Sequence, residues 1–468
     1  MNHAQSKKLL MILICVIIFI NSSFTCFATE LEEAAQARKQ LPIQSNEIKD
    51  WPEGPEIGAQ AAILMDAGTG TILYAKNIHQ ELYPASTTKI MTCLLAVENA
   101  SLDDTVTFSY DAIHSVPADG SNIGIDAGEY LSLEECLYGI MVGSANEVAN
   151  AVAEHVSGSI DAFVDLMNEK AKSLGCTNTH FANTNGLQDS NHYTSAYDLA
   201  LIGREFFSNE LLCRVGNTPR YHFEPSAGQK DDFYLNNKHK LINGEISYNG
   251  ICGGKTGYTD LARETLVTCA ERGNMKLVCV VFMEESPAQF TDTVTLFDYG
   301  FNNFKAVNVK SEEKSYIPES NSFFTSGEDI FGSAYSVLDF SKSDYVILPQ
   351  NADLSDTTST VSYDEAGNGT VATINYSYND TPVGKVHVII SDSASQAKQT
   401  LSSQDSERII YINVKTCLLV FVIAGGTLII LIYISALIST YSFGGSLEDR
   451  KRLSRRKKEA RKRSGPRF

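Results

Sequence analysis

Three short stretches of the sequence carry side chains that suit acyl transfer by a serine. They are Ser86 with Lys89 in "ASTTKIMT", Ser144 with Asn146 in "GSAN", and Lys255, Thr256 and Gly257 in "GGKTG". A serine hydroxyl is a weak nucleophile until a neighbouring base removes its proton. Positions i and i+3 of a helix lie on one face, so Lys89 can lie beside Ser86. The first stretch therefore permits a nucleophile with its base.

Each stretch also has an ordinary structural explanation. The pattern Ser-x-x-Lys recurs three more times in the chain, so it is not specific on its own. Ser86 and Ser144 are suitable helix caps, and Lys255-Thr-Gly is a suitable turn. A lysine acts as a base only if burial and nearby cations lower its pKa toward neutrality. It is the order of the three stretches, each at the boundary of a predicted element, that favours the catalytic interpretation.

The surrounding sequence predicts a sheet built from distant segments and covered by helices. Residues 61–76 form two apolar strands around a Gly-Thr-Gly turn, and residues 264–270 and 275–283 form two more around Gly273-Asn274. The Lys255 stretch precedes this second pair. Apolar spacing predicts one helix that begins at Ser86 and another that follows a capping box formed by Ser132 and Glu135. It predicts three further helices over residues 145–156, 160–175 and 194–207.

The two ends of the chain predict export and anchoring. Two lysines, an apolar run and small residues follow one another at the start, which predicts a secretory signal peptide over residues 1–28. Residues 416–438 carry no charge, and about 20 apolar residues suffice to cross a bilayer, so we expect a transmembrane helix there. The tail at 439–468 is basic, and Lys and Arg gather on the cytoplasmic side. We therefore expect a single-pass membrane protein with its body outside the cell.

Charge and composition divide and constrain the exported part. The tail from Arg450 holds eleven Lys or Arg and one Glu, which gives it a net charge of +10. Since the whole chain has a net charge of −18, residues 1–449 have a net charge of −28. An acidic body argues against a nucleic-acid partner. Residues 29–58 are a polar lead-in to a catalytic domain at 59–302. Short alternating strands predict a small β domain at 306–393, followed by a linker at 394–415.

The cysteines and histidines suggest neither disulfides nor a metal site. Seven of the ten cysteines lie outside the predicted signal and anchor, and they form no Cys-x-x-Cys pair, so we expect buried free thiols. His180 and His192 are isolated from any metal-binding spacing. We expect neither a metal nor an organic cofactor. Asp198 is predicted to bond backbone, and His192 has no assigned role.

The ordered motifs S-x-x-K, S-x-N and K-T-G are the signature of penicillin-binding proteins and serine β-lactamases. The longer stretches "LMDAGTGTILYAKNIHQELYPASTTKIMT", "FVDLMNEKAKSLGCTNTHFANTNGL" and "GICGGKTGYTD" resemble the D-alanyl-D-alanine carboxypeptidase family of low-molecular-weight penicillin-binding proteins. The resemblance covers residues 59–302. It implies an α/β (α+β) catalytic domain of the β-lactamase/transpeptidase type, with an antiparallel sheet covered by helices and a helical subdomain.

The resemblance also implies roles for the motif residues. Ser86 would be the nucleophile, Lys89 its base, and Ser144 a relay of the proton to the leaving amine. Asn146 would hold the substrate backbone, and Lys255 with Thr256 would face the terminal carboxylate of the peptide. Gly257 would leave room for the substrate along the strand. The backbone N–H groups of Ser86 and Tyr258 would form the oxyanion hole.

The sequence departs from the family pattern at one place. The family commonly carries an arginine beyond the strand after K-T-G, where it helps to hold the substrate carboxylate. Here that region contains neither Arg nor Lys, and Gln289 falls at the arginine's place. Arg263 stands where the family usually has glycine. We expect Arg263 or Thr256 to compensate.

The expected function is removal of the terminal D-alanine from peptidoglycan pentapeptides, with covalent binding of β-lactam antibiotics. One alternative is a class A β-lactamase, which shares the three motifs. That class clears its acyl intermediate with a glutamate between the second and third motifs, and no glutamate occurs between Glu169 and Glu205. The other alternative is a membrane-tethered wall-binding protein with a decayed site, which Gln289 keeps open.

Overall fold

The protein is described by a computed structural model that covers residues 32–117, 119–312, 327–328, 334–335, 338–363, 369–390, 427, 429–438, 451–452, 454–455 and 458. Contacts divide the chain into two compact units, Met1–Ser395 and Gln396–Phe468. The predicted signal peptide and the predicted linker at 394–415 lie outside the described residues. Everything that follows on the sheet, the helices and the site concerns the first unit.

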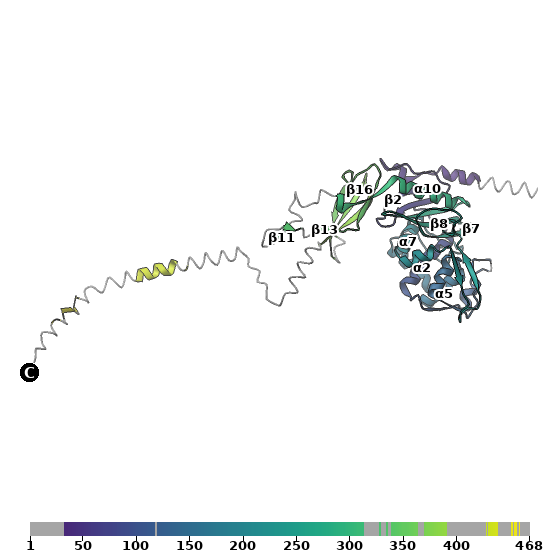
Figure 1. Cartoon of the computed structure of the whole chain (residues 1–468), viewed down its shortest axis with the longest axis horizontal. Coiled ribbons are helices and arrows are strands. Elements are labelled where there is room, and N and C mark those ends of the chain that lie inside the picture. The colour runs from purple at the N-terminus through teal and green to yellow at the C-terminus, as the bar shows by residue number, and fades with distance from the viewer. Residues whose placement is uncertain are drawn as a thin grey trace, which may run out of the picture. The chain divides into compact units, whose positions relative to one another are not determined.

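A five-stranded antiparallel sheet forms the centre of this unit (Figure 1). Its strand order is β2-β1-β9-β8-β7, with bounds Ile72–Lys76, Ala61–Asp66, Met275–Glu284, Arg263–Arg272 and Ile251–Thr259. Both predicted strand pairs are confirmed, and Gly273 takes a positive φ of 60° in the turn between β8 and β9. Lys255, Thr256 and Gly257 precede strand β8, as predicted, and they lie inside a further strand, the edge strand β7, for which the sequence analysis gave no bounds. Their high glycine content concealed the strand.

The two faces of the sheet bury different side chains, as expected for a strand whose residues alternate. Ala61, Ile63 and Met65 of β1 pack with the helices α2, α4, α5 and α7, whereas Ala62 and Leu64 pack with α10. These helices span Lys89–Asn99, Leu133–Met141, Asn146–Ser157, Ala196–Ser208 and Ala288–Asn303. The sheet therefore has helices on both faces, which confirms the predicted α/β catalytic domain.

The remaining elements connect this core. They are η1 (Gln44–Glu47), η2 (Ala85–Thr88), β3 (Thr105–Thr107), α3 (Tyr110–His114), β4 (Tyr130–Ser132), α6 (Ile160–Ser173), α8 (Glu210–Gly216), β5 (Arg220–Phe223), β6 (Phe233–Asn236) and α9 (Lys240–Asn243). The predicted capping box before α4 is present, since the Ser132 hydroxyl accepts from the Glu135 N–H and the Glu135 carboxylate accepts from the Ser132 N–H. The predicted helix at Ser86 begins as the 3-10 turn η2 and continues as α2.

Short strands follow α10. They are β10 (Phe304–Asn308), β11 (Gly327–Glu328), β12 (Ala334–Tyr335), β13 (Leu338–Phe340), β14 (Tyr345–Pro349), β15 (Thr358–Ser362), β16 (Thr370–Tyr378) and β17 (Thr381–Ile390), with α11 (Val309–Glu312) and η3 (Leu354–Asp356) between them. One sheet has the order β13-β17-β16-β15, and β10 pairs with β14. Trp51 joins these strands to the core, because its ring packs on Phe304 and Tyr378 while its Nε1 donates to the Leu73 carbonyl at 2.9 Å.

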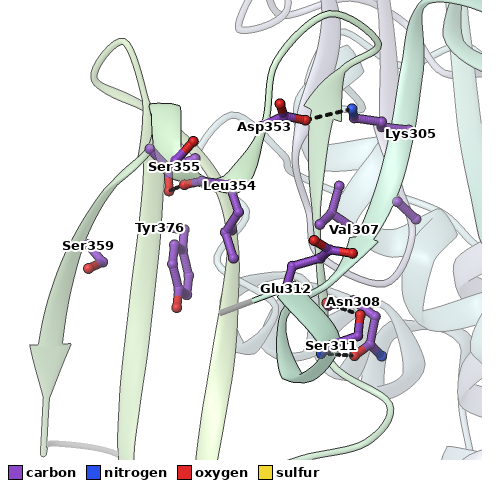
Figure 2. A pocket seen from close by; sticks show the side chains of 12 residues that line it. Lys305, Val307, Asn308, Ser311, Glu312, Asp353, Leu354, Ser355, Ser359 and Tyr376 are labelled. Atoms are coloured by element: carbon purple, nitrogen blue, oxygen red, sulfur yellow. Dashed lines mark hydrogen bonds and ion pairs between the residues drawn. The ribbon is translucent and has the colours of Figure 1, made fainter. Parts of the chain in front are cut away.

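A polar cavity of about 770 Å³ lies among β10, α11, η3, β15 and β16 (Figure 2). The ion pair between Lys305 Nζ and Asp353 Oδ1, at 3.3 Å, lies at one side of it. None of the motif residues lines this cavity. It is therefore separate from the site described below, although it is the larger of the two.

About half of the predicted transmembrane helix at 416–438 lies outside the described residues. Within this segment, residues 427 and 429–438 are described, and they are helical. Within the described part of the chain, no helix combines the length and the apolar character that spanning a bilayer requires.

Candidate active site

The structure brings the three sequence stretches together around the amine of Lys89. Its Nζ lies 3.0 Å from Ser86 Oγ, 2.6 Å from Asn146 Oδ1 and 2.6 Å from the carbonyl oxygen of Asn185. Ser86 belongs to η2, and Lys89 opens α2 one turn later. Asn146 is the first residue of α5, and its side chain reaches the amine from the start of that helix. The predicted proximity of the hydroxyl and the amine is therefore present.

The second lysine approaches the site from the sheet. Lys255 on β7 donates from Nζ to Ser144 Oγ at 3.0 Å and to the Thr256 carbonyl at 2.8 Å. Ser144 lies in the turn before α5 with a positive φ of 61°, which aims its side chain at the strand. The hydroxyl of Ser144 is thus held by Lys255, whereas Lys89 binds Asn146. The sequence alone did not indicate this division.

Burial determines the protonation of both lysines. Loss of water is the first cause that lowers the pKa of Lys89 well below its usual value, and the charge of Lys255 is the second. Burial also lowers the pKa of Lys255 to about 7, with Lys238 as the next cause. Neither amine forms an ion pair among the described residues, and the charge of Glu147, which raises the pKa of Lys89, is a smaller cause than burial and Lys255. Lys89 is therefore suited to accept a proton at neutral pH.

A cleft of about 610 Å³ opens above these groups. The predicted residues that line it are Ser86, Ser144, Asn146, Thr256, Gly257 and Tyr258. Lys89 and Lys255 lie beneath them, buried. A side chain at 257 would put its Cβ 2.9 Å from both the Pro84 carbonyl oxygen and the Ser86 backbone nitrogen. Gly257 therefore lets β7 approach η2 closely, a role additional to the predicted room for substrate.

Several residues of the cleft were missed by the sequence analysis. Lys238 and Lys240 line it, and Asn185 and Gly186 contribute its opposite part. A Cβ at 186 would collide with the Ala85 carbonyl, so the glycine allows this loop to rest on η2. The dense basic run "KHK" at 238–240 was the available signal for the two lysines.

His192, which had no assigned role, supports the turn that carries Ser86. Its Nδ1 accepts from the Ala182 N–H at 3.0 Å, so its Nε2 carries the proton and donates to Thr88 Oγ1 at 2.8 Å. Thr88 in turn donates to the Ala85 carbonyl at 2.8 Å. Burial lowers the pKa of His192 to about 4, which keeps the ring neutral.

The prediction for Asp198 is confirmed. Its Oδ2 accepts from the Asn178 N–H at 2.6 Å and from Thr179 Oγ1 at 2.7 Å, so it is structural. The prediction of free thiols is confirmed for the seven cysteines outside the predicted signal and anchor, of which Cys93, Cys136, Cys269 and Cys279 are fully buried.

Known proteins share this arrangement over a large part of the chain. The sequence profile described as D-alanyl-D-alanine carboxypeptidase matches residues 48–286, which is just over half of the chain. The chain belongs to the D-alanyl-D-alanine carboxypeptidase family. The predicted family is therefore confirmed.

Two curated relatives illustrate the extent of the sequence likeness. The D-alanyl-D-alanine carboxypeptidase DacF of Bacillus subtilis is 38% identical over 253 residues, which are 53% of this chain and 63% of that protein. DacB2 of Mycobacterium tuberculosis is 32% identical over 256 residues, 53% of this chain and 84% of that protein. The chain thus matches less than two thirds of DacF.

Solved structures extend the likeness past the residues that the family profile covers. Penicillin binding protein 5 of Haemophilus influenzae has a TM-score of 0.59 at 26% identity, and covers 72% of this chain and 98% of its own. Penicillin binding protein 6B of Escherichia coli has a TM-score of 0.55 at 25% identity, with 74% and 98% covered.

Gln289 is the residue that the sequence analysis placed at the position of the family's arginine. The side chain lines the cleft from the first turn of α10 and is buried, and its Oε1 has no hydrogen-bond partner. Counting along the sequence therefore placed Gln289 in the cleft correctly.

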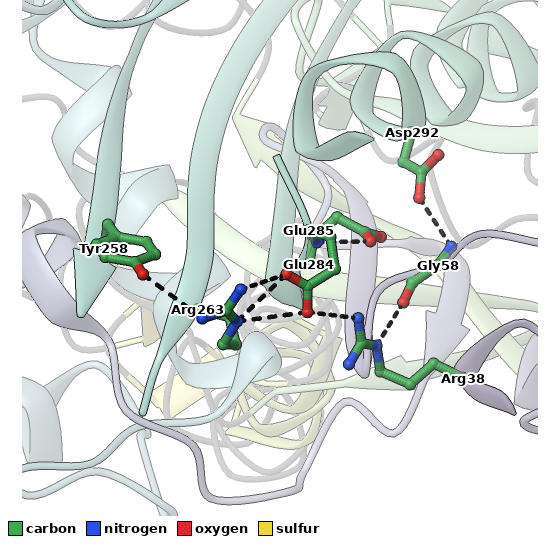
Figure 3. A network of polar contacts seen from close by, with 7 residues as sticks. All are labelled: Arg38, Gly58, Tyr258, Arg263, Glu284, Glu285 and Asp292. Atoms are coloured by element: carbon green, nitrogen blue, oxygen red, sulfur yellow. Dashed lines mark hydrogen bonds and ion pairs between the residues drawn. The ribbon is translucent and has the colours of Figure 1, made fainter. Parts of the chain in front are cut away.

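Arg263 lies elsewhere. Its Nη2 forms an ion pair with Glu285 Oε2 at 2.6 Å, and it does not line the cleft (Figure 3). The expectation that Arg263 holds the substrate carboxylate gains no support from this geometry, because its guanidinium is already bound to a carboxylate of the protein.

Proposed function

We propose that the chain is a serine-type D-Ala-D-Ala carboxypeptidase that removes the terminal D-alanine from peptidoglycan pentapeptide stems. One observation carries the proposal: a buried amine with a lowered pKa lies 3.0 Å from the Ser86 hydroxyl, at the floor of a cleft. Geometry and protonation thus agree on a base beside a nucleophile. Family membership supplies the substrate class.

In the first step, neutral Lys89 takes the proton of Ser86, and Oγ attacks the carbonyl carbon of the penultimate D-alanine. The oxyanion that forms would be bound by the backbone N–H groups of Ser86 and Tyr258, an arrangement worth about 10²–10³ in rate per donor. The carbon–nitrogen bond then breaks. The departing amine receives the proton that Lys89 took up, relayed through Ser144.

In the second step, water attacks the acyl ester of Ser86, again with Lys89 as the base, and the shortened peptide leaves. The terminal carboxylate of the substrate would be held by Thr256 and by Lys255 in its charged form. Gln289 would add hydrogen bonds without a charge. A β-lactam would acylate Ser86 in the same way and leave more slowly.

The setting of this chemistry follows from the two ends of the chain. We assign residues 1–28 to a signal peptide, residues 416–438 to a single membrane span and residues 439–468 to the cytoplasmic side. The catalytic domain at 59–302 and the β domain at 306–393 would then face the cell wall. If so, a chain that ends at residue 415 is released into the medium, whereas the full chain stays with the membrane fraction.

The test of the reaction compares two substrates on the full-length protein. Labelled penicillin and a peptide that ends in D-Ala-D-Ala are supplied separately, and adduct formation and D-alanine release are followed. A long-lived adduct at Ser86 together with D-alanine release supports the proposal. Rapid turnover of penicillin would instead indicate a β-lactamase, and neither reaction would indicate a wall-binding protein without activity.

A further inference from the structure

Glu285 lies between two arginines, Arg38 and Arg263, that are far apart in the sequence (Figure 3). Arg263 Nη2 donates to its Oε2 at 2.6 Å, and Arg263 Nε lies 3.2 Å from the same oxygen and 3.3 Å from Oε1. Arg38 Nη2 donates to Oε1 at 3.1 Å. All three side chains are at least three quarters buried but keep some exposure to solvent. Two planar donor groups on one carboxylate fix its orientation more firmly than a single ion pair would.

Arg263 holds its place in a backbone conformation that disfavours it. Its φ is 52°, which is uncommon for a residue with a side chain and natural for glycine. Such a conformation persists where the surroundings determine it. The hydrogen bonds to Glu285 hold Arg263 in this conformation. We therefore assign to the arginine at this position the role of binding Glu285.

Arg38 belongs to a segment that precedes the residues matched by the family profile, which begin at residue 48. The segment is fastened to the sheet by Lys76, whose buried Nζ donates to the Arg38 carbonyl at 2.8 Å and to the Ile57 carbonyl at 2.7 Å. Arg38 Nε also donates to the Gly58 carbonyl at 2.9 Å. The guanidinium is therefore presented to Glu285 by a fixed backbone.

The three residues connect two walls of the cleft. Three residues shortly after Glu285 in the chain line the cleft, namely Ser286, Gln289 and Phe290. On the other side, Arg263 Nη1 lies 3.5 Å from the Tyr258 hydroxyl, at the cleft end of β7 (Figure 3). A displacement of Glu285 would move the first turn of α10, which carries Gln289, relative to the strand along which the peptide is expected to lie.

We propose that Arg38, Glu285 and Arg263, together called the clamp, are positioning residues that set the separation between the wall formed by residues 286–290 and strand β7, and thereby the affinity for the peptide substrate. This inference rests on the proposed function. The N-terminal segment is then a working part of the substrate site, although it lies outside the residues that define the family. None of the three residues touches Ser86 or Lys89, so the chemical step itself is left intact.

The test measures KM and kcat separately for a peptide ending in D-Ala-D-Ala, with full-length Arg38→Gln and Glu285→Gln proteins. A loosened wall is expected to raise KM by about fivefold to tenfold and to change kcat by less than about twofold, since small misplacements of bound groups weaken productive binding. Because both variants break one unit, the double variant is expected to be no worse than the poorer single one.

Arg214→Gln is a control, because it breaks an ion pair of similar length, Arg214 to Glu134 at 3.2 Å, between more exposed residues that do not line the cleft. It should leave KM unchanged. Arg263→Gly tests the same contact without backbone strain and guards against a Glu285 variant that does not fold.

Labelling with penicillin separates this inference from the proposed function. Full labelling of every variant with a raised KM only in the Arg38, Glu285 and Arg263 variants supports the clamp. A KM equal to that of the unchanged protein in these variants overturns it, even if their melting temperatures fall. Absence of both labelling and D-alanine release in the unchanged protein overturns the proposed function, and the clamp with it.

Discussion

Two pairs of basic residues lie next to the cleft. Lys89 and Lys255 lie beneath its floor, Arg38 and Arg263 lie behind the wall formed by residues 286–290, and the two pairs have opposite surroundings. Within the described part of the chain, the buried amines of Lys89 and Lys255 donate to hydroxyl, amide and carbonyl oxygens and to no carboxylate. Arg38 and Arg263 share the carboxylate of Glu285. Burial lowers the pKa of both lysines and outweighs the charge of Glu147 near Lys89, whereas an arginine stays charged in any protein setting.

The difference shows how one kind of charge serves two purposes. A buried amine that forms no ion pair loses its proton more easily than an exposed one. It can therefore exchange a proton near neutral pH. A cation bound to a carboxylate keeps its proton and contributes direction and distance instead. The floor is therefore suited to proton transfer and the wall to positioning, and exchange of residue types between them should exchange their properties.

The largest expected effect comes from giving the floor the residue type of the wall. In Lys89→Arg the guanidinium stays protonated, so no base is available for Ser86. We expect kcat/KM for a D-Ala-D-Ala peptide to fall by about 10³-fold, within the range of general-base contributions. The rate of penicillin acylation should fall in parallel.

Lys276→Arg is the control for this change. Lys276 is a half-buried lysine on β9 that donates to the Phe207 carbonyl at 2.7 Å, away from the cleft. Its arginine variant should keep the activity of the unchanged protein. A Lys89→Arg protein that folds and retains more than a tenth of the activity would contradict the assignment of Lys89 as the base.

The next effect concerns the pH dependence. Lys255 has a pKa of about 7, lowered from its usual value, so it is charged below pH 7 and loses its charge as the pH rises through that value. If the charged form binds the substrate carboxylate, KM rises above pH 7, by about tenfold for each further pH unit. The measurement is a pH profile of kcat/KM, whose alkaline limb reports this loss.

Lys255→Arg sharpens this profile. The guanidinium remains charged, so the alkaline limb should move by at least about two pH units to higher pH, whatever the loss in absolute rate. The histidines nearest the site contribute no limb near pH 6, because burial lowers the pKa of His192 to about 4 and that of His239 to about 3. An unmoved alkaline limb in Lys255→Arg would assign the limb to another group.

The floor was predictable from the sequence, whereas of the wall only the place of Gln289 was. Ser86 and Lys89 are one helical turn apart, so local geometry brings them together. Their meeting with Lys255 required three motifs in a known order. Arg38 and Glu285 are 247 residues apart, and no motif records their contact. Only the fold, which places the N-terminal segment beside the loop after β9, brings them together.

Two elements that build the cleft also escaped the sequence analysis, for local reasons. Strand β7 contains three glycines, which weaken the alternation that marks a strand. Helix α10 carries three threonines and a valine within Thr291–Thr295, and β-branched residues are poor helix formers. Packing of Phe290, Leu296 and Phe297 against the sheet outweighs that preference.

A smaller effect is expected where the floor meets the sheet. In Gly257→Ala the new Cβ would collide with Thr265 Oγ1 and would lie 2.9 Å from the Ser86 nitrogen and from the Pro84 carbonyl oxygen, so β7 must shift relative to both the Thr265 side chain and η2. We expect penicillin acylation to slow by about tenfold and stability to fall by about 1–3 kcal/mol, the usual cost of overpacking. Gly216→Ala is the control, since its nearest neighbour would be 3.4 Å away. Equal acylation rates in the two variants would show that this close approach does not matter.

The smallest effect separates the wall from the floor by ionic strength. The contacts of Glu285 with its two arginines are partly exposed, so salt weakens them, whereas fully buried Lys89 has no ion pair to screen. Raising the salt from 0.05 to 0.5 M should therefore raise KM by about twofold with little change in kcat. Part of any such rise comes from screening between the substrate carboxylate and Lys255, and Glu285→Gln retains that part. The difference between the two salt responses measures the wall alone, and identical responses would mean that Glu285 and its arginines do not affect substrate affinity.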